Sequence, residues 1–134
     1  MNEIEKAGKL LAVLLKGEFV REYEGWKVRV ISDDYEISIQ QYRILDTRET
    51  RWRTSIEISR KDLVYAEPEP FRRSPNMPLQ IITVEIDKFK MLVDTYYSFR
   101  WRRNGVKEGR MIHILVVYGK LSAREILRIM SCFL

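Results

Sequence analysis

Arginine and aromatic residues are interleaved in three separate segments of this sequence. Cationic side chains hold a phosphate backbone, and aromatic rings stack on unpaired bases, so this combination is typical of single-stranded DNA- or RNA-binding surfaces. The third segment is the densest and reads YYSFRWRRNGVKEGR, residues 96–110. The predicted nucleic-acid-binding residues are Arg43, Arg51, Trp52, Arg53, Phe71, Arg72, Arg73, Arg100, Trp101, Arg102, Arg103, Lys107 and Arg110.

The placement of charge favours the same function. The 134-residue chain has 24 Lys and Arg against 19 Asp and Glu, a formal net charge of +5. Residues 96–110 contain five basic side chains and one acidic one, so most of the excess positive charge lies in one short segment. Localised positive charge attracts phosphate backbones through counterion release. We therefore expect a nucleic-acid partner, with single strands favoured.

The same composition also fits a second function class. Arg, Trp and Tyr are enriched at the energetic centres of protein interfaces. An arginine-rich hairpin together with a proline-rich loop would suit docking to an acidic protein surface. The alternative is thus a small regulatory or inhibitory interaction module, such as a mobile genetic element encodes.

Acidic residues raise a third possibility, a metal-dependent nuclease. Asp33, Asp34 and Glu36 lie near the start of one predicted strand, and Glu57 lies on the next. The expected order of elements resembles that of restriction-type nucleases, which also need an acid-x-lysine pair. Here the candidate pair ends in Ser59, two residues before Lys61. Magnesium requires convergent carboxylates, and the sequence leaves their convergence open.

Other catalytic chemistry has little support. His113 is the only histidine and lies in an apolar run, where a hydrogen-bonded core residue is the commoner outcome. With Cys132 as the only cysteine, one chain cannot assemble a common zinc site. The sequence has no G-x-S-x-G elbow, phosphate-binding loop or dinucleotide fingerprint. We expect a non-catalytic protein without metal or cofactor.

Composition also suggests a compartment. The longest apolar run, residues 10–15, is too short to cross a bilayer, and no signal peptide is evident. A lone cysteine agrees with a reducing environment. We expect a cytoplasmic protein without membrane contact. The high charge content and the few Asn and Gln residues resemble the composition of thermophile proteins.

Hydrophobic periodicity predicts the elements that position these residues. Residues 2–16 fit an amphipathic helix with Asn2 as its N-cap and Gly17 as its C-terminal stop. Residues 26–31, 35–45 and 52–58 alternate as antiparallel strands, with Trp26, Val28 and Val30 on the covered side. The outward side chains have mixed signs, which indicates cross-strand charge pairs; they are Lys27, Arg29, Glu36, Gln40, Arg53 and Glu57.

The second half of the sequence contains one ambiguous region. Residues 66–78 hold all four prolines and predict a surface loop, followed by a strand at 79–86. Asp87 suits the cap of a helix that starts at Lys88 and ends near residue 94 or 95. Residues 97–103 then form a hairpin strand before Asn104-Gly105, a strong turn signal. The alternative is a helix that continues to Arg103 beyond the core.

The C-terminal part predicts a central strand and a final helix. Residues 111–118 are apolar on both faces, and Ser122 and Glu125 form a capping box. The wide apolar face of residues 122–134 implies burial in the chain's own core or in a homodimer. The expected fold is a single α+β domain, residues 1–134, in the order α-β-β-β-loop-β-α-β-β-α. Its sheet is mainly antiparallel and is covered on one face by helices.

Overall fold

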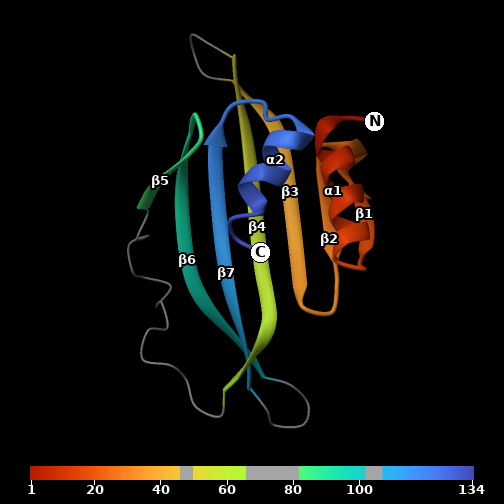
Figure 1. Ribbon diagram of the computed structural model, residues 1–134, viewed down its shortest axis with the longest axis vertical. Helices are drawn as coiled ribbons and strands as arrows, with labels where there is room; N and C mark the ends of the chain where they lie inside the picture. The colour runs from red at the N-terminus through yellow and green to blue at the C-terminus, as the bar shows by residue number, and fades with distance from the viewer. Residues whose placement is uncertain (46–49, 66–81, 102–106) are drawn as a thin grey trace.

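The computed structural model describes residues 1–45, 50–65, 82–101 and 107–134, with only the backbone at 50, 61–65, 82, 96–101 and 107–108. Seven antiparallel strands form one sheet in the order β1-β2-β3-β4-β7-β6-β5 (Figure 1). The elements are α1 (Glu3–Leu14), β1 (Glu18–Glu22), η1 (Tyr23–Gly25), β2 (Lys27–Ile31), β3 (Tyr35–Leu45), β4 (Thr50–Tyr65), β5 (Ile82–Ile86), β6 (Phe89–Trp101), β7 (Lys107–Tyr118) and α2 (Ala123–Met130).

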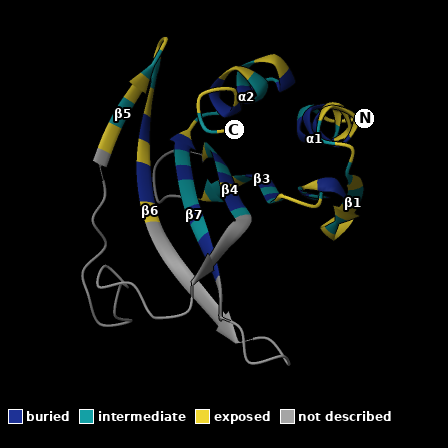
Figure 2. Cartoon of the chain, turned by 60° about the horizontal axis from the view of Figure 1, so that its bottom comes forward, coloured by how far each residue is buried: buried dark blue, intermediate teal, exposed yellow. Residues whose placement is uncertain are grey.

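Both helices pack on the same face of the sheet, which confirms the predicted α+β class (Figure 1). Buried residues recur along the strands beneath the helices (Figure 2). Alternation brings Ile37 and Ile39 of β3 together with Ile56 and Ile58 of β4, and all four are at most 1% exposed. From the helices, the same core receives Ile4, Ala7, Leu11, Ile126, Ile129 and Met130. The apolar face of α2 is thus buried within its own chain.

The predicted helix starts are confirmed. The side chain of Asn2 accepts a hydrogen bond from the Glu5 amide at 2.9 Å, and Ser122 and Glu125 form the reciprocal capping box. The two helix starts are also joined, because the Ala123 amide donates to the Glu3 carboxylate at 2.9 Å. α1 and α2 are therefore fixed to each other as well as to the sheet.

The end of α1 differs from the prediction. Lys16, and not Gly17, adopts the left-handed conformation, with φ 52°. The Gly17 amide donates to the Ala12 carbonyl at 2.8 Å, which closes the helix. A Cβ at Gly17 would lie 2.7 Å from the Ile31 carbonyl oxygen. Gly17 is therefore needed for the close approach of the chain to the end of β2.

Two predictions of element order were wrong. The predicted helix of residues 88–95 is absent, because residues 89–95 belong to β6 and residue 88 to the turn before it. Phe89, Met91 and Val93 pack toward the core with strand spacing. The prediction was misled because Phe89, Leu92 and Val93 also fit the spacing of one helix face. The two-residue turn before them places Asp87 at φ 54°, a conformation that aspartate tolerates. The short edge strand β1 was not predicted, because its alternation covers only five residues.

The hairpin interpretation of residues 97–103 is confirmed as far as the structure describes them. β6 pairs antiparallel with β7 up to Trp101, which lies opposite Lys107. The predicted Asn104-Gly105 turn and the proline-rich segment 66–78 lie outside the described residues. β7 lies between β4 and β6, as its two apolar faces predicted.

A buried glutamine connects the middle of the sheet to the start of α2. Gln41 of β3 is 6% exposed, and its amide donates to the Thr54 hydroxyl at 3.1 Å and the Leu121 carbonyl at 2.9 Å. Thr54 in turn donates to the Gly119 carbonyl at 2.8 Å. These bonds hold the β7–α2 connection against β3 and β4, and so they fix α2 over the core.

Candidate nucleic-acid interface

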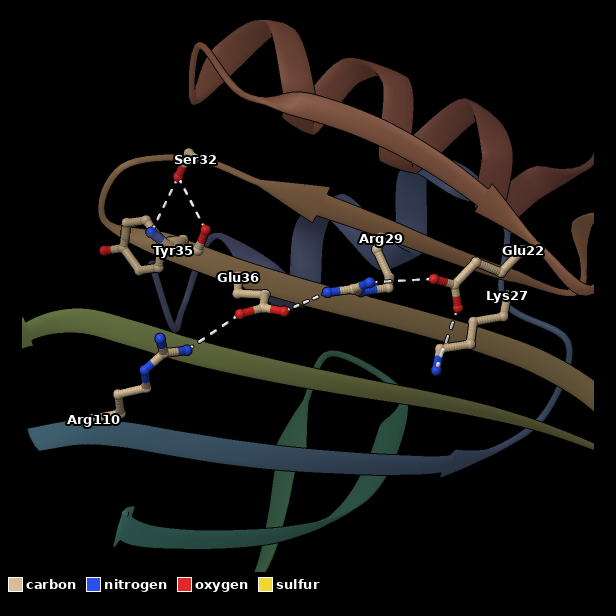
Figure 3. A network of polar contacts seen from close by, with 7 residues as sticks. All are labelled: Glu22, Lys27, Arg29, Ser32, Tyr35, Glu36 and Arg110. Atoms are coloured by element: carbon tan, nitrogen blue, oxygen red, sulfur yellow. Dashed lines mark hydrogen bonds and ion pairs between the residues drawn. The ribbon is translucent and has the colours of Figure 1, made fainter. Parts of the chain in front are cut away.

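A chain of five charged side chains crosses the open face, the face of the sheet opposite the helices (Figure 3). Glu36 of β3 accepts from Arg29 of β2 at 2.5 Å and from Arg110 of β7 at 3.2 Å. Arg29 also donates to Glu22 at 3.2 Å, and Glu22 lies 3.6 Å from the Lys27 ammonium. We call this the charged ladder. It confirms the cross-strand charge pairs predicted from the alternation.

Arg110 reaches across a whole strand to join the ladder. β4 lies between β7 and β3, and its Ser59 is directly opposite both Glu36 and Ile112. The small serine leaves room above β4 for the arginine, whose side chain is only 11% exposed. Arg29 donates to the other oxygen of the same carboxylate, and the hydrogen bonds that it donates to Glu36 and then to Glu22 raise the pKa of Arg29. The ladder therefore holds its cations in place.

A hollow of about 200 Å³ lies beside the ladder on the open face. Its position follows from size, because Ser38 and Ser59 are short and their neighbours on the face are long. Glu57 also lines the hollow, and it is exposed and engages no ion pair or hydrogen bond among the described residues. The Ser59 hydroxyl is buried and likewise meets no partner there. The lining residues are Lys27, Arg29, Glu36, Ser38, Glu57, Ser59, Arg110 and Ile112.

An aromatic row continues from the hollow toward one end of the sheet. Tyr23 and Trp26 stack with ring centroids 4.9 Å apart, and Tyr42 meets Trp26 edge-on at 6.2 Å. Cations lie over both ends of the row. Arg53 is 5.8 Å from the Tyr42 ring, and Lys27 is 5.7 Å from the Tyr23 ring. Lys27 also lines the hollow, so it links the row to the ladder.

A second cation–aromatic group lies on the helix side of the same sheet end. The Trp52 ring is between Lys120, 4.4 Å from its centroid, and Arg43, 5.1 Å from it. Trp52 alternates with the buried Thr54, which places it on the helix side of β4. Basic and aromatic side chains therefore occupy both faces at this end.

Strand register explains how arginines and rings share a face. Within one strand, alternation directs adjacent side chains to opposite faces. Between strands, however, Tyr42 is opposite Arg53, and Arg43 is opposite Trp52. Each arginine thus meets the ring of the neighbouring strand, so one face carries both groups.

The predicted binding residues divide into three groups. Arg53 and Arg110 lie on the open face, Arg43 and Trp52 on the helix side, and Arg51 is exposed near them. The backbone alone is described at Arg100, Trp101 and Lys107, which lie on β6 and β7. The predicted residues outside the described parts are Phe71, Arg72, Arg73, Arg102 and Arg103.

Several residues of the interface escaped prediction. Trp26 was expected on the covered side with Val28, yet it is 45% exposed, because the short η1 helix interrupts the alternation just before β2. Tyr23 is 59% exposed and was not considered. Lys120 follows β7 and reaches Trp52 from there. The η1 turn brings Tyr23 and Trp26 together, and the pairing of separate strands adds Tyr42 and Arg53.

The acidic residues proposed for a nuclease site, all of them described, do not form a metal-binding cluster, although Glu36 and Glu57 both line the hollow. Glu36 belongs to the ladder, and Asp33 and Asp34 are exposed in the β2–β3 turn. In the described parts of the chain, no cluster of three or more His, Cys, Asp or Glu could hold a metal ion. Ser59 remains in the place of the nuclease lysine, and the side chain of Lys61 is not described.

The single histidine and the single cysteine stand apart from the open face. His113 Nδ1 lies 2.9 Å from the Thr95 hydroxyl, and burial, followed by repulsion from Arg60, lowers its pKa. Its ring is 5.7 Å from the Phe133 ring. Cys132 is exposed.

The fold and site define a small α+β domain whose antiparallel sheet has one face under helices and one face bearing the charged ladder, the hollow and the aromatic row. A scan of protein-family models, a search of curated proteins and a search of solved structures each found no match. Neither helix within the described ranges is long and apolar enough to cross a membrane.

Proposed function

We propose that the open face binds single-stranded DNA or RNA. The observation that carries this proposal is the aromatic row, in which Tyr23 and Trp26 are well exposed and lie beside Lys27 and Arg53. Exposed rings in line, with a cation at each end of the row, provide base stacking and phosphate contacts in one surface. Such stacking is tolerant of sequence because every base has a π-face.

The spacing of the row supports a strand that runs across the sheet. Tyr23, Trp26 and Tyr42 come from η1, the start of β2 and the end of β3, so their rings succeed one another across the strands. A single strand laid along this row places its backbone near Arg53 at one end and Lys27 at the other. The ladder contributes less to phosphate binding, because its arginines are already bound to carboxylates.

Fluorescence anisotropy with labelled twelve-nucleotide dT and U oligonucleotides tests the proposal. We expect log K to fall linearly with log salt. Tyr23→Ala should weaken binding by roughly 5- to 100-fold, the loss of about 1–3 kcal/mol for one stacked base. Arg53→Ala should lower the salt slope by about one. Circular dichroism confirms that each variant folds.

A matched control is Arg124→Ala, because this exposed arginine lies on α2, on the helix side of the sheet. It should change binding less than twofold (~0.4 kcal/mol). Absence of binding to either oligonucleotide at low salt would refute the proposed function. Binding that is unchanged in Tyr23→Ala and Arg53→Ala would place the interface elsewhere on the protein.

A further inference from the structure

We infer that the hollow beside the ladder is a selective site for a guanine base of the bound strand, an inference that rests on the proposed function. The hollow and the aromatic row are joined through Lys27, which contacts Tyr23 and lines the hollow. A strand stacked on the row therefore has one nucleotide next to the hollow. Pockets for drug-sized ligands enclose about 300–1,000 Å³, so a hollow of about 200 Å³ suits a single base.

Glu57 supplies the acceptor in this site. Its carboxylate is exposed, lines the hollow and is not engaged by any cation of the described residues, in contrast to Glu36 on the next strand. An ionised carboxylate only accepts hydrogen bonds and has two oxygens to offer. Guanine is the base that presents two adjacent donors, N1–H and the N2 amine, on its Watson–Crick edge. In uracil and thymine the single N–H is flanked by carbonyls that repel a carboxylate.

Donors lie on two flanks of the hollow. Arg110 of β7 and Lys27 of β2 both line it, on either side of β3 and β4, and arginine and lysine are the usual partners of guanine O6 and N7. The Ser59 hydroxyl is buried, lines the hollow and has no partner among the described residues. A buried polar group without a partner is costly, and a base seated here would satisfy it. The hollow thus offers both the acceptor and the donors that guanine requires.

The ladder makes the site rigid before any base arrives. Glu36 holds Arg110 at 3.2 Å and Arg29 at 2.5 Å, so these two arginine side chains do not have to be ordered on binding. Ordering a flexible side chain at an interface opposes binding. Glu57 is then the residue that determines which base is bound, and the ladder holds the arginines around it in place.

Anisotropy with four twelve-nucleotide strands tests this assignment. The strands are oligo-dT with a central G, A, C or T. The wild-type protein should bind the G strand at least fivefold more tightly than the other three. Glu57→Gln should reduce this preference to less than twofold, through weaker binding of the G strand. Ser38→Val fills the hollow with a strand-compatible side chain and should also abolish the preference.

Glu85→Gln is the matched control, because this exposed carboxylate lies on β5 at the far edge of the sheet and should keep the full preference. Failure to bind any strand would refute the proposed function itself. Binding of all four strands with equal affinity would overturn the guanine site alone. A preference for G that survives in Glu57→Gln would overturn the role of Glu57.

Discussion

Serine at position 59 shapes the open face more than any charged residue does. Its small side chain lets Arg110 extend over β4 to Glu36, and it forms part of the floor of the hollow. A larger side chain would separate the two charges and fill the hollow. In the sequence, Ser59 is notable only because a serine stands where the nuclease pattern requires a lysine. Its structural role depends on residues of the two neighbouring strands, β3 and β7.

Glu36 and Glu57 lie on the same face of β3 and β4 and should respond differently to loss of charge. Glu36→Gln leaves Arg110 and Arg29 without their shared carboxylate, and Arg110 is mostly buried. We expect the free energy of unfolding to fall by about 1–3 kcal/mol. Urea unfolding followed by circular dichroism measures this change.

Glu57→Gln is the control for that measurement. Glu57 is exposed and makes no ion pair among the described residues, so we expect a change within about 0.5 kcal/mol. Equal losses in the two variants would show that the ladder does not stabilise the fold. Together the variants separate a structural carboxylate from one available to a ligand.

At the scale of elements, the junction between α1 and β1 combines two backbone requirements in adjacent residues. Lys16 adopts a left-handed conformation that favours glycine, whereas Gly17 has no room for a Cβ beside the Ile31 carbonyl. Position 16 has the backbone conformation that favours glycine, but the glycine is at position 17. The close contact at position 17 is the more severe of the two constraints.

Single substitutions at these two positions should change the free energy of unfolding in opposite directions. Gly17→Ala pushes the chain away from the end of β2 and should lower the free energy of unfolding by about 1–3 kcal/mol. Lys16→Gly relieves the left-handed strain and should raise it by about 0.5–1 kcal/mol. Thermal and urea unfolding check both. Stabilisation by Gly17→Ala would contradict the close approach to Ile31.

Local signals predicted the elements that local chemistry determines. Asn2, Ser122 and Glu125 cap helices through hydrogen bonds within three residues, so their sequence spacing was sufficient. Residues 88–95 carry apolar side chains that fit both the helical and the strand period. Tertiary pairing with β7 decided between them.

The candidate interface was less predictable than the fold. The arginines and rings were recognisable, but their grouping depends on register, and alternation within one strand does not determine register. The pairing of Tyr42 with Arg53 and the bridge from Arg110 across β4 to Glu36 both arise between strands. The hollow arises from two serines that no motif singles out.

At the scale of the whole molecule, stability should depend on pH in two separate ranges. Burial lowers the pKa of His113 below its usual 6.5, so the unfolded chain takes up the proton first as pH falls. The free energy of unfolding should therefore decrease from about pH 7.5 down to the folded pKa. Hydrogen bonds from backbone amides lower the pKa of Glu3 and Glu125, and their stabilisation is lost only below the usual 4.5.

His113→Gln should remove the first range and leave the second. Urea unfolding at a series of pH values measures both, and the ring proton shift of the single histidine gives its folded pKa directly. A titration midpoint above 6.5, or wild-type stability that is flat between about pH 7.5 and 5.5, would contradict the prediction.

The hydrogen bond between Glu3 and the start of α2 has a consequence for biosynthesis. It joins residues 120 positions apart, so α1 leaves the ribosome long before its partner exists. In that interval Ile56 and Ile58 lack the cover that Ile126, Ile129 and Met130 later provide. A nascent chain at this stage exposes apolar surface of the kind that chaperones bind. The core can close only after translation has passed α2.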